Sequence, residues 1–175
     1  MAPAPFSGLL TRAANGSREQ TMVQITGAYS GDALEDIRML FAEYAASLPF
    51  ELSFQGFHKE LASLPGEYTP PSGRLLLATD AGNGAGCAAL RKMSADSCEL
   101  KRMYVRPDFR GKGIGRLLAE HIVSEARSIG YGSIRLDTIA SMKEAISLYR
   151  SLGFVAIAPY RFNPIEGAQY MELRF

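Results

Sequence analysis

The stretch from Glu99 to Gly115, ELKRMYVRPDFRGKGIG, predicts a strand that leads through a glycine-rich turn directly into a helix. Pro107 ends the strand, and from Ile114 onward apolar residues recur at helical spacing. Three consecutive residues before the turn favour extended backbone: Met103, Tyr104 and Val105. In this order of elements, the C-terminal end of the strand is followed directly by the N-terminus of the helix.

The glycine-rich turn has the properties of an anion site. A helix N-terminus carries unpaired N–H groups and the positive end of the helix dipole, and the glycines at 111, 113 and 115 remove side chains that would block a close approach. Phosphate is the expected ligand. Basic residues also gather here: Lys101, Arg102, Arg106, Arg110, Lys112 and Arg116.

Two common phosphate motifs do not fit this turn. A P-loop needs Gly-Lys followed by Ser or Thr after a suitably spaced glycine, and the turn has none. A dinucleotide-binding fingerprint needs a third glycine where Arg116 or Leu118 stands. The remaining pattern is Arg-x-x-Gly-x-Gly, from Arg110 to Gly115.

A second motif, Leu-Tyr-x-x-x-Gly-Phe, occupies residues 148–154. Together with Tyr104-Val-Arg-Pro107 and the Arg-x-x-Gly-x-Gly turn, it resembles the GNAT superfamily of acetyl-CoA-dependent N-acetyltransferases. The resemblance covers about residues 22–175 and is best over 86–155. It implies a mixed α/β fold with a central, mostly antiparallel sheet flanked by helices, and acetyl-CoA as the acetyl donor.

The resemblance also implies which residues bind coenzyme A. The turn would hold the pyrophosphate, and the preceding strand would run along the pantetheine arm. Many family members have asparagine seven residues before the motif tyrosine, where this chain has Met142, so that Ser141 beside it is the substitute. The implied coenzyme A residues are Met103, Tyr104, Val105, Arg110, Gly111, Lys112, Gly113, Ile114, Gly115, Arg116 and Ser141.

Two residues are implied as catalytic. Some family members carry a glutamate base at the strand position of Glu99, and the motif tyrosine, here Tyr149, commonly protonates the coenzyme A thiolate. The alternative for Glu99 is an exposed residue in a salt bridge with Lys101 or Arg102. The alternative for Tyr149 is a buried packing residue, and the two roles are compatible.

The expected function is direct transfer of an acetyl group from acetyl-CoA to a primary amine of an unidentified small-molecule or peptide acceptor. A non-catalytic module that binds or senses acyl-CoA is the alternative, and a dinucleotide-binding protein is a third possibility that the missing glycine weakens. Thiol release in the presence of amines separates the first two.

Length and charge set further expectations. The 175 residues are 47% hydrophobic, which predicts one domain over 21–175 after a flexible tail at 1–20. A net charge of +1 gives no general reason to bind nucleic acid or a membrane surface. Because neither a long apolar stretch nor a signal-peptide pattern occurs, we expect a cytoplasmic protein, monomeric or homodimeric.

The remaining reactive side chains suggest no further chemistry. Cys87 and Cys98 are expected to be buried thiols out of register for a disulfide, and no metal-ligand spacing occurs. His121 is expected to pack on its helix. His58 lies in the aromatic segment 49–71, which is either core beneath a connecting segment or a wall of the acceptor site. The segment around Tyr160, Arg161 and Asn163 is expected to be a surface loop, with the acceptor side as the alternative.

Spacing and turn residues predict the order of elements. Helices are expected over 32–48, over 113–129 and over 141–151, the last capped by Ser141 with Glu144, after a short helical run that ends at Leu64. A hairpin turn is expected over 81–85. Strands are expected over 22–28, 74–80, 86–92, 97–106, 133–137, 154–158 and 169–174.

Overall fold

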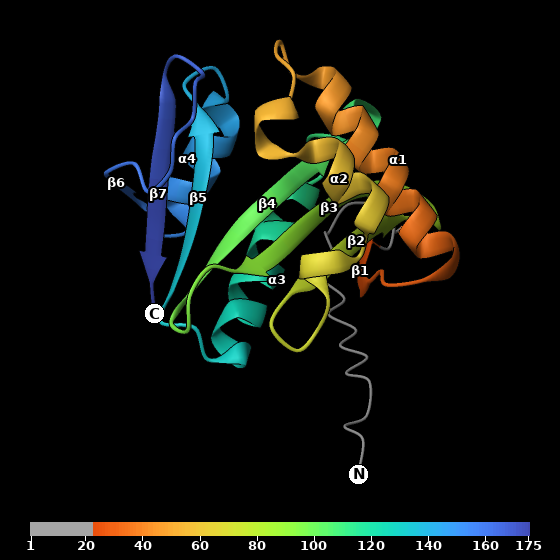
Figure 1. Ribbon diagram of the computed structural model, residues 1–175. Coiled ribbons are helices and arrows are strands. Elements are labelled where there is room, and N and C mark those ends of the chain that lie inside the picture. The colour runs from red at the N-terminus through yellow and green to blue at the C-terminus, as the bar shows by residue number, and fades with distance from the viewer. Residues whose placement is uncertain (1–22) are drawn as a thin grey trace.

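The structure is a computed structural model that describes residues 23–175. The tail expected at residues 1–20, and the first two residues of the domain expected over 21–175, lie outside the described part. Seven strands form one sheet in the order β1-β2-β3-β4-β5-β7-β6 (Figure 1). The predicted mixed α/β fold with a mostly antiparallel sheet flanked by helices is confirmed.

The elements agree with the predicted order. The strands are β1 Val23–Gly27, β2 Arg74–Asp80, β3 Asn83–Lys92, β4 Ser97–Val105, β5 Ser133–Ile139, β6 Val155–Ile157 and β7 Ala168–Arg174. The helices are α1 Gly31–Ser47, α2 Phe57–Ser63, α3 Ile114–Ile129 and α4 Lys143–Ser151. Short 3-10 helices occupy Ser53–Gln55 (η1), Gly66–Tyr68 (η2) and Pro107–Phe109 (η3).

The sheet opens at its centre. Every neighbouring pair is antiparallel except β4 and β5, which run parallel and pair over only three residues, Ser97–Glu99 with Ser133–Arg135. Beyond Glu99 the two strands diverge, as Figure 1 shows. Beyond Glu99, the backbone edge of β4 that faces β5 therefore has no paired strand.

Helices cover both faces of the sheet. Helices α1 and α2 bury Ile37, Leu40, Phe41 and Phe57 against one face. Helix α3 buries Leu118 and Ile122 against the other face, where Tyr149 of α4 joins the same core. None of the helices within residues 23–175 combines the length and the apolar composition needed to cross a membrane.

A bulge interrupts β4 beside the opening. The pairing of β3 with β4 shifts between Cys87 and Ala89, and Arg102 has a positive φ of 53°. An extra residue in a strand breaks the alternation of side chains between the two faces. Lys101 and Arg102 therefore both point to the face that carries α1 and α2, since both reach Gln55 of η1.

Two local predictions are wrong. Helix α4 begins at Lys143 with Met142 at its N-cap, which makes no side-chain cap bond, so that the predicted Ser141–Glu144 capping box does not form. The reason is that residues 141 and 142 form the turn after β5, where the Met142 amide bonds to the Ile139 carbonyl. The hairpin turn is also shorter than 81–85, because β3 begins at Asn83.

Candidate active site

The N-terminus of α3 presents open backbone amides. Gly111 and Gly113 have φ values of 78° and 80°, a left-handed conformation that favours glycine, and a Cβ at either position would meet open space. Gly113 is the N-cap of α3 and no side chain caps this end. The first N–H groups of the helix are therefore available to an anionic ligand.

A cleft of about 680 Å³ runs between this turn, β4 and the start of α4. Nine of the residues predicted to bind coenzyme A line it: Met103, Tyr104, Val105, Arg110, Gly111, Gly113, Ile114, Gly115 and Ser141. The cleft walls also include Phe109, Lys143, Glu144 and Leu148. Backbone from both sides of the opening in the sheet thus contributes to one continuous groove.

Lys112 and Arg116 do not line the cleft. The Lys112 ammonium donates to Asp80 at 2.8 Å, and the Arg116 guanidinium donates to Ser151 at 2.8 Å. Arg110 lines the cleft with its Nε bound to the Val105 carbonyl at 3.0 Å. Of the three basic side chains in and after the turn, Arg110 alone borders the cleft.

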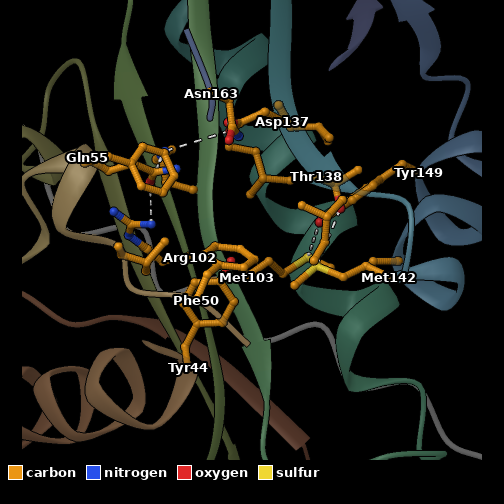
Figure 2. A pocket seen from close by; sticks show the side chains of 17 residues that line it. Tyr44, Phe50, Gln55, Arg102, Met103, Asp137, Thr138, Met142, Tyr149 and Asn163 are labelled. Carbon is orange, nitrogen blue, oxygen red and sulfur yellow. Dashed lines mark hydrogen bonds and ion pairs between the residues drawn. The ribbon is translucent and has the colours of Figure 1, made fainter. Parts of the chain in front are cut away.

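A smaller pocket of about 80 Å³ continues from the cleft through the opening between β4 and β5. The two cavities share four lining residues: Tyr44, Met103, Met142 and Ala145. Figure 2 shows Gln55 and Arg102 on one side of the pocket and Thr138 and Tyr149 on the other, with Met103 between them. A reactive group at the end of the cleft would therefore face this pocket.

Tyr149 lines the small pocket beside a residue that the two cavities share. Its side chain is buried in the core below α4, and its hydroxyl group is 3.9 Å from the Met103 sulfur, which borders both cavities. Burial raises the pKa of Tyr149 well above its usual value. The hydroxyl group therefore stays protonated at neutral pH. Packing and proton donation are compatible at this position.

Glu99 lies in the sheet and lines neither cavity. Its Oε2 accepts from Arg91 at 2.9 Å, and its Oε1 accepts from the Tyr160 hydroxyl at 3.0 Å and pairs with Arg161. The alternative of an exposed residue paired with Lys101 or Arg102 is wrong, because Glu99 is only 1% exposed. Its ion-pair partners are instead Arg91 of β3 and Arg161 of the β6–β7 loop.

Lys101 and Arg102 form a buried cationic wall of the pocket. Gln55 Oε1 accepts from Lys101 Nζ at 3.1 Å and from Arg102 Nη1 at 2.8 Å. Arg102 Nε also pairs with Glu60 at 2.8 Å. Desolvation, with the charge of Arg102 as the next cause, lowers the pKa of Lys101 to about 8.

The loop between β6 and β7 closes the pocket from the side of β5. Asn163 lines the pocket and donates to Asp137 Oδ2 at 3.2 Å, while Tyr160 and Arg161 reach Glu99. The segment is a loop, as expected, and its half-buried Asn163 borders the pocket. The loop is drawn inward because it satisfies the buried carboxylates of β4 and β5.

Comparison with known proteins gives the family. Residues 71–156 match the family model of the acetyltransferase (GNAT) domain. An uncharacterised N-acetyltransferase of Schizosaccharomyces pombe is 40% identical over 142 residues, which cover 80% of this chain and 87% of the relative. The chain belongs to the GNAT acetyltransferase family.

Solved GNAT structures agree with the fold. An acetyltransferase from Streptococcus agalactiae superposes with a TM-score of 0.72 at 20% identity, covering 87% of this chain and 98% of that one. A Salmonella typhimurium structure described as an acetyltransferase with its cofactor acetyl-CoA has a TM-score of 0.65 at 20% identity, covering 87% and 93%. GNAT proteins use acetyl-CoA as the acetyl donor, and this GNAT chain is an N-acetyltransferase.

The other reactive side chains of this GNAT domain lie away from the two cavities. Cys87 and Cys98 are buried free thiols, as predicted, and burial raises the pKa of Cys98 to about 12. His121 bonds to the Leu117 carbonyl of its own helix, and His58 lines neither cavity. Within residues 23–175 no cluster of three or more His, Cys, Asp or Glu side chains is placed to hold a metal ion.

Several pocket residues of this GNAT domain were not predicted from the sequence. Gln55, Lys101, Arg102 and Asp137 come from three separate segments, and a strict period of two would place Lys101 and Arg102 on opposite faces. The sequence indicates this part of the pocket only through the aromatic residues of segment 49–71, for which an acceptor wall is one interpretation. Phe50, Leu52 and Phe54 of that segment do line the pocket.

Proposed function

We propose that the protein transfers the acetyl group of acetyl-CoA directly to a primary amine held in the pocket between β4 and β5. The observation that carries this proposal is the position of Tyr149 in the wall of the small pocket, where its hydroxyl group lies 3.9 Å from the sulfur of Met103, a residue that lines both cavities. A thioester next to Met103 would have a proton donor beside its sulfur and an acceptor chamber in front of its carbonyl group.

The cleft suits coenzyme A in size and polarity. The amides of Gly111, Gly113 and the first turn of α3 would bind the pyrophosphate, with Arg110 beside them. The pantetheine arm would lie along Met103, Tyr104 and Val105, on the part of β4 that β5 leaves unpaired. Ser141 borders the cleft and would contact the same ligand from the α4 side.

The reaction needs no covalent enzyme intermediate. The neutral amine attacks the thioester carbonyl carbon, the new C–N bond forms, the C–S bond breaks, and Tyr149 donates its proton to the leaving thiolate. The amine proton leaves through a base or water. Neither thiol lines a cavity, which is consistent with direct transfer.

Glu99 stays a predicted base whose role depends on a rearrangement. Both of its oxygens are engaged by Arg91, Tyr160 and Arg161. For Glu99 to accept a proton from the amine, one of these contacts has to open when the acceptor binds, or a water has to bridge the two groups. A substitution at Glu99 tests this requirement.

An amine panel with free-thiol detection tests the proposed function. Saturating acetyl-CoA is mixed with amino acids, polyamines, aromatic amines and peptides, and thiol release is followed against an amine-free blank. We expect release that depends on amine concentration and yields the N-acetyl product by mass spectrometry. Acetyl-CoA binding without amine-dependent release would instead support the module that senses acyl-CoA.

A further inference from the structure

The pocket wall contains two adjacent buried cations, Lys101 and Arg102, of which only Arg102 has a carboxylate within hydrogen-bond distance. The bulge in β4 turns Lys101 and Arg102 to the same side, and their side chains are only 4% and 3% exposed. Two neighbouring buried cations repel each other and lose their hydration. Such an arrangement is costly unless an anion compensates it.

Arg102 has a hydrogen-bonded carboxylate partner, whereas Lys101 has only a long ion pair. Glu60 lies 2.8 Å from Arg102 Nε, whereas the carboxylate closest to the Lys101 ammonium is Asp137, at 4.0 Å. Gln55, which the two cations share, is neutral. The Lys101 ammonium has three donors and one hydrogen bond of this kind, so that two N–H groups remain for a ligand.

Asp137 has polar partners besides Lys101. Its Oδ2 accepts from Asn163 at 3.2 Å, and Arg161 lies 3.9 Å from its Oδ1. The buried cluster around the pocket contains the cations Arg91, Lys101, Arg102 and Arg161 and the carboxylates Glu60, Glu99 and Asp137. A further carboxylate, Glu67, reaches Arg91 from the solvent side.

We propose that the acceptor is a primary amine that also carries a carboxylate, as a free amino acid does, and that Lys101 and Arg102 bind this carboxylate in the pocket. The inference rests on the proposed acetyl transfer and names the class of its acceptor. The carboxylate takes the two free N–H groups of Lys101 and the unused Nη groups of Arg102, and Asp137 on the opposite strand faces the amine.

The size of the pocket agrees with this class. A volume of about 80 Å³ accommodates a carboxylate and the few carbon atoms that separate it from an amine. A polyamine would place a second positive charge against Lys101 and Arg102, and the N-terminus of a peptide has an uncharged amide where an amino acid has its carboxylate. Neither class supplies an anion within hydrogen-bond distance of the Lys101 ammonium, which has only the ion pair at 4.0 Å.

Matched pairs of acceptors test the proposal on the wild-type protein. Each L-amino acid of a panel is compared with its carboxamide, which keeps the shape and the amine and removes the negative charge. We expect kcat/KM to be at least about 10-fold higher for the acid of the preferred pair. Equal or faster turnover of the amides overturns the carboxylate site and leaves the acetyl transfer standing, whereas a lack of amine-dependent thiol release refutes both.

Lys101→Met identifies the side chain responsible. Methionine keeps the length and apolar stem of lysine, so that the acid-to-amide ratio of kcat/KM is expected to fall to about 1, mainly through KM for the acid. Lys92→Met, at the exposed end of β3, is the control and keeps the wild-type ratio. Circular dichroism and acetyl-CoA affinity check that Lys101→Met is folded, and an unchanged acid-to-amide ratio in the folded variant contradicts the assignment. If Lys101→Met does not fold, Lys101→Gln is measured in its place.

Discussion

At the scale of single residues, the site separates side chains that face the reaction from side chains that hold the frame. Tyr149 has one polar neighbour, the Met103 sulfur at 3.9 Å, so its hydroxyl group is not committed to a strong partner. Glu99 is the opposite case, with both oxygens engaged. Substitutions that change one atom distinguish these two situations.

Tyr149→Phe removes the proposed acid and keeps the packing against Phe154. We expect kcat to fall by about 100-fold or more, with acetyl-CoA affinity nearly unchanged, because the thiolate then leaves without a proton. Steady-state kinetics and calorimetric titration measure the two quantities. Tyr131→Phe, which removes a buried hydroxyl group bound to the Ser72 carbonyl, is the matched control with wild-type kcat. A wild-type rate in Tyr149→Phe would leave the tyrosine only its packing role.

Glu99→Gln tests the predicted base. We expect kcat/KM to fall by about 100-fold near neutral pH, with the loss shrinking as the pH rises, since more of the acceptor amine is then already deprotonated. The measurement is a pH profile of kcat/KM for both proteins. A loss of equal size at every pH would show that Glu99 acts by holding Arg161 and the β6–β7 loop.

At the scale of elements, the α3 N-terminus is formed by residues that are consecutive in the sequence, whereas the bulge in β4 depends on pairing with other strands. The turn at 111–113 is built from consecutive residues with open space around them. The bulge depends on the pairing of β4 with β3 and on its lack of pairing with β5 beyond Glu99. One element therefore supplies the backbone that would bind phosphate, and the other supplies the side chains of the acceptor pocket.

Gly113→Asp tests the phosphate site. The substitution adds bulk and negative charge at the helix N-terminus, and we expect acetyl-CoA affinity to fall at least about 10-fold by calorimetric titration. Gly130→Asp is the control, because Gly130 also has a positive φ, 101° against 80°, equally open surroundings and a place at the opposite end of α3. The control carries a similar conformational cost and should bind acetyl-CoA normally. Equal affinities in the two variants would move the pyrophosphate elsewhere.

At the scale of the whole molecule, backbone pairing between the two halves of the sheet is limited to a short parallel contact, although a shared core and the Glu99–Arg161 ion pair also join them. Beyond the three residue pairs of β4 and β5, the halves β1–β4 and β5–β7 diverge (Figure 1). Residues from both halves line the cleft. A ligand in the cleft contacts both halves at once. Its binding energy therefore adds to the stability of the folded chain as a unit.

Acetyl-CoA is therefore expected to stabilise the protein against heat. At a concentration of about 100 times its Kd it adds about 2.7 kcal/mol to the free energy of unfolding, which raises Tm by about 5 to 10 °C for a domain of this size. Differential scanning calorimetry with and without ligand measures the shift. NAD is the control and leaves Tm unchanged; an equal shift with NAD would favour a dinucleotide site.

The sequence by itself determined what depends on neighbouring residues. The order of elements, the glycine turn before α3 and the placement of Tyr149 in its motif follow from propensity, spacing and turn chemistry, all of which act over a few residues. Only the tertiary structure decided that Lys101 and Arg102 share a face, that Gln55 joins them from 46 residues away, and that Glu99 is held by Arg91 and Arg161. These relations arise from strand pairing and a bulge, and the free energy of such long-range contacts is not encoded in any local pattern of residues.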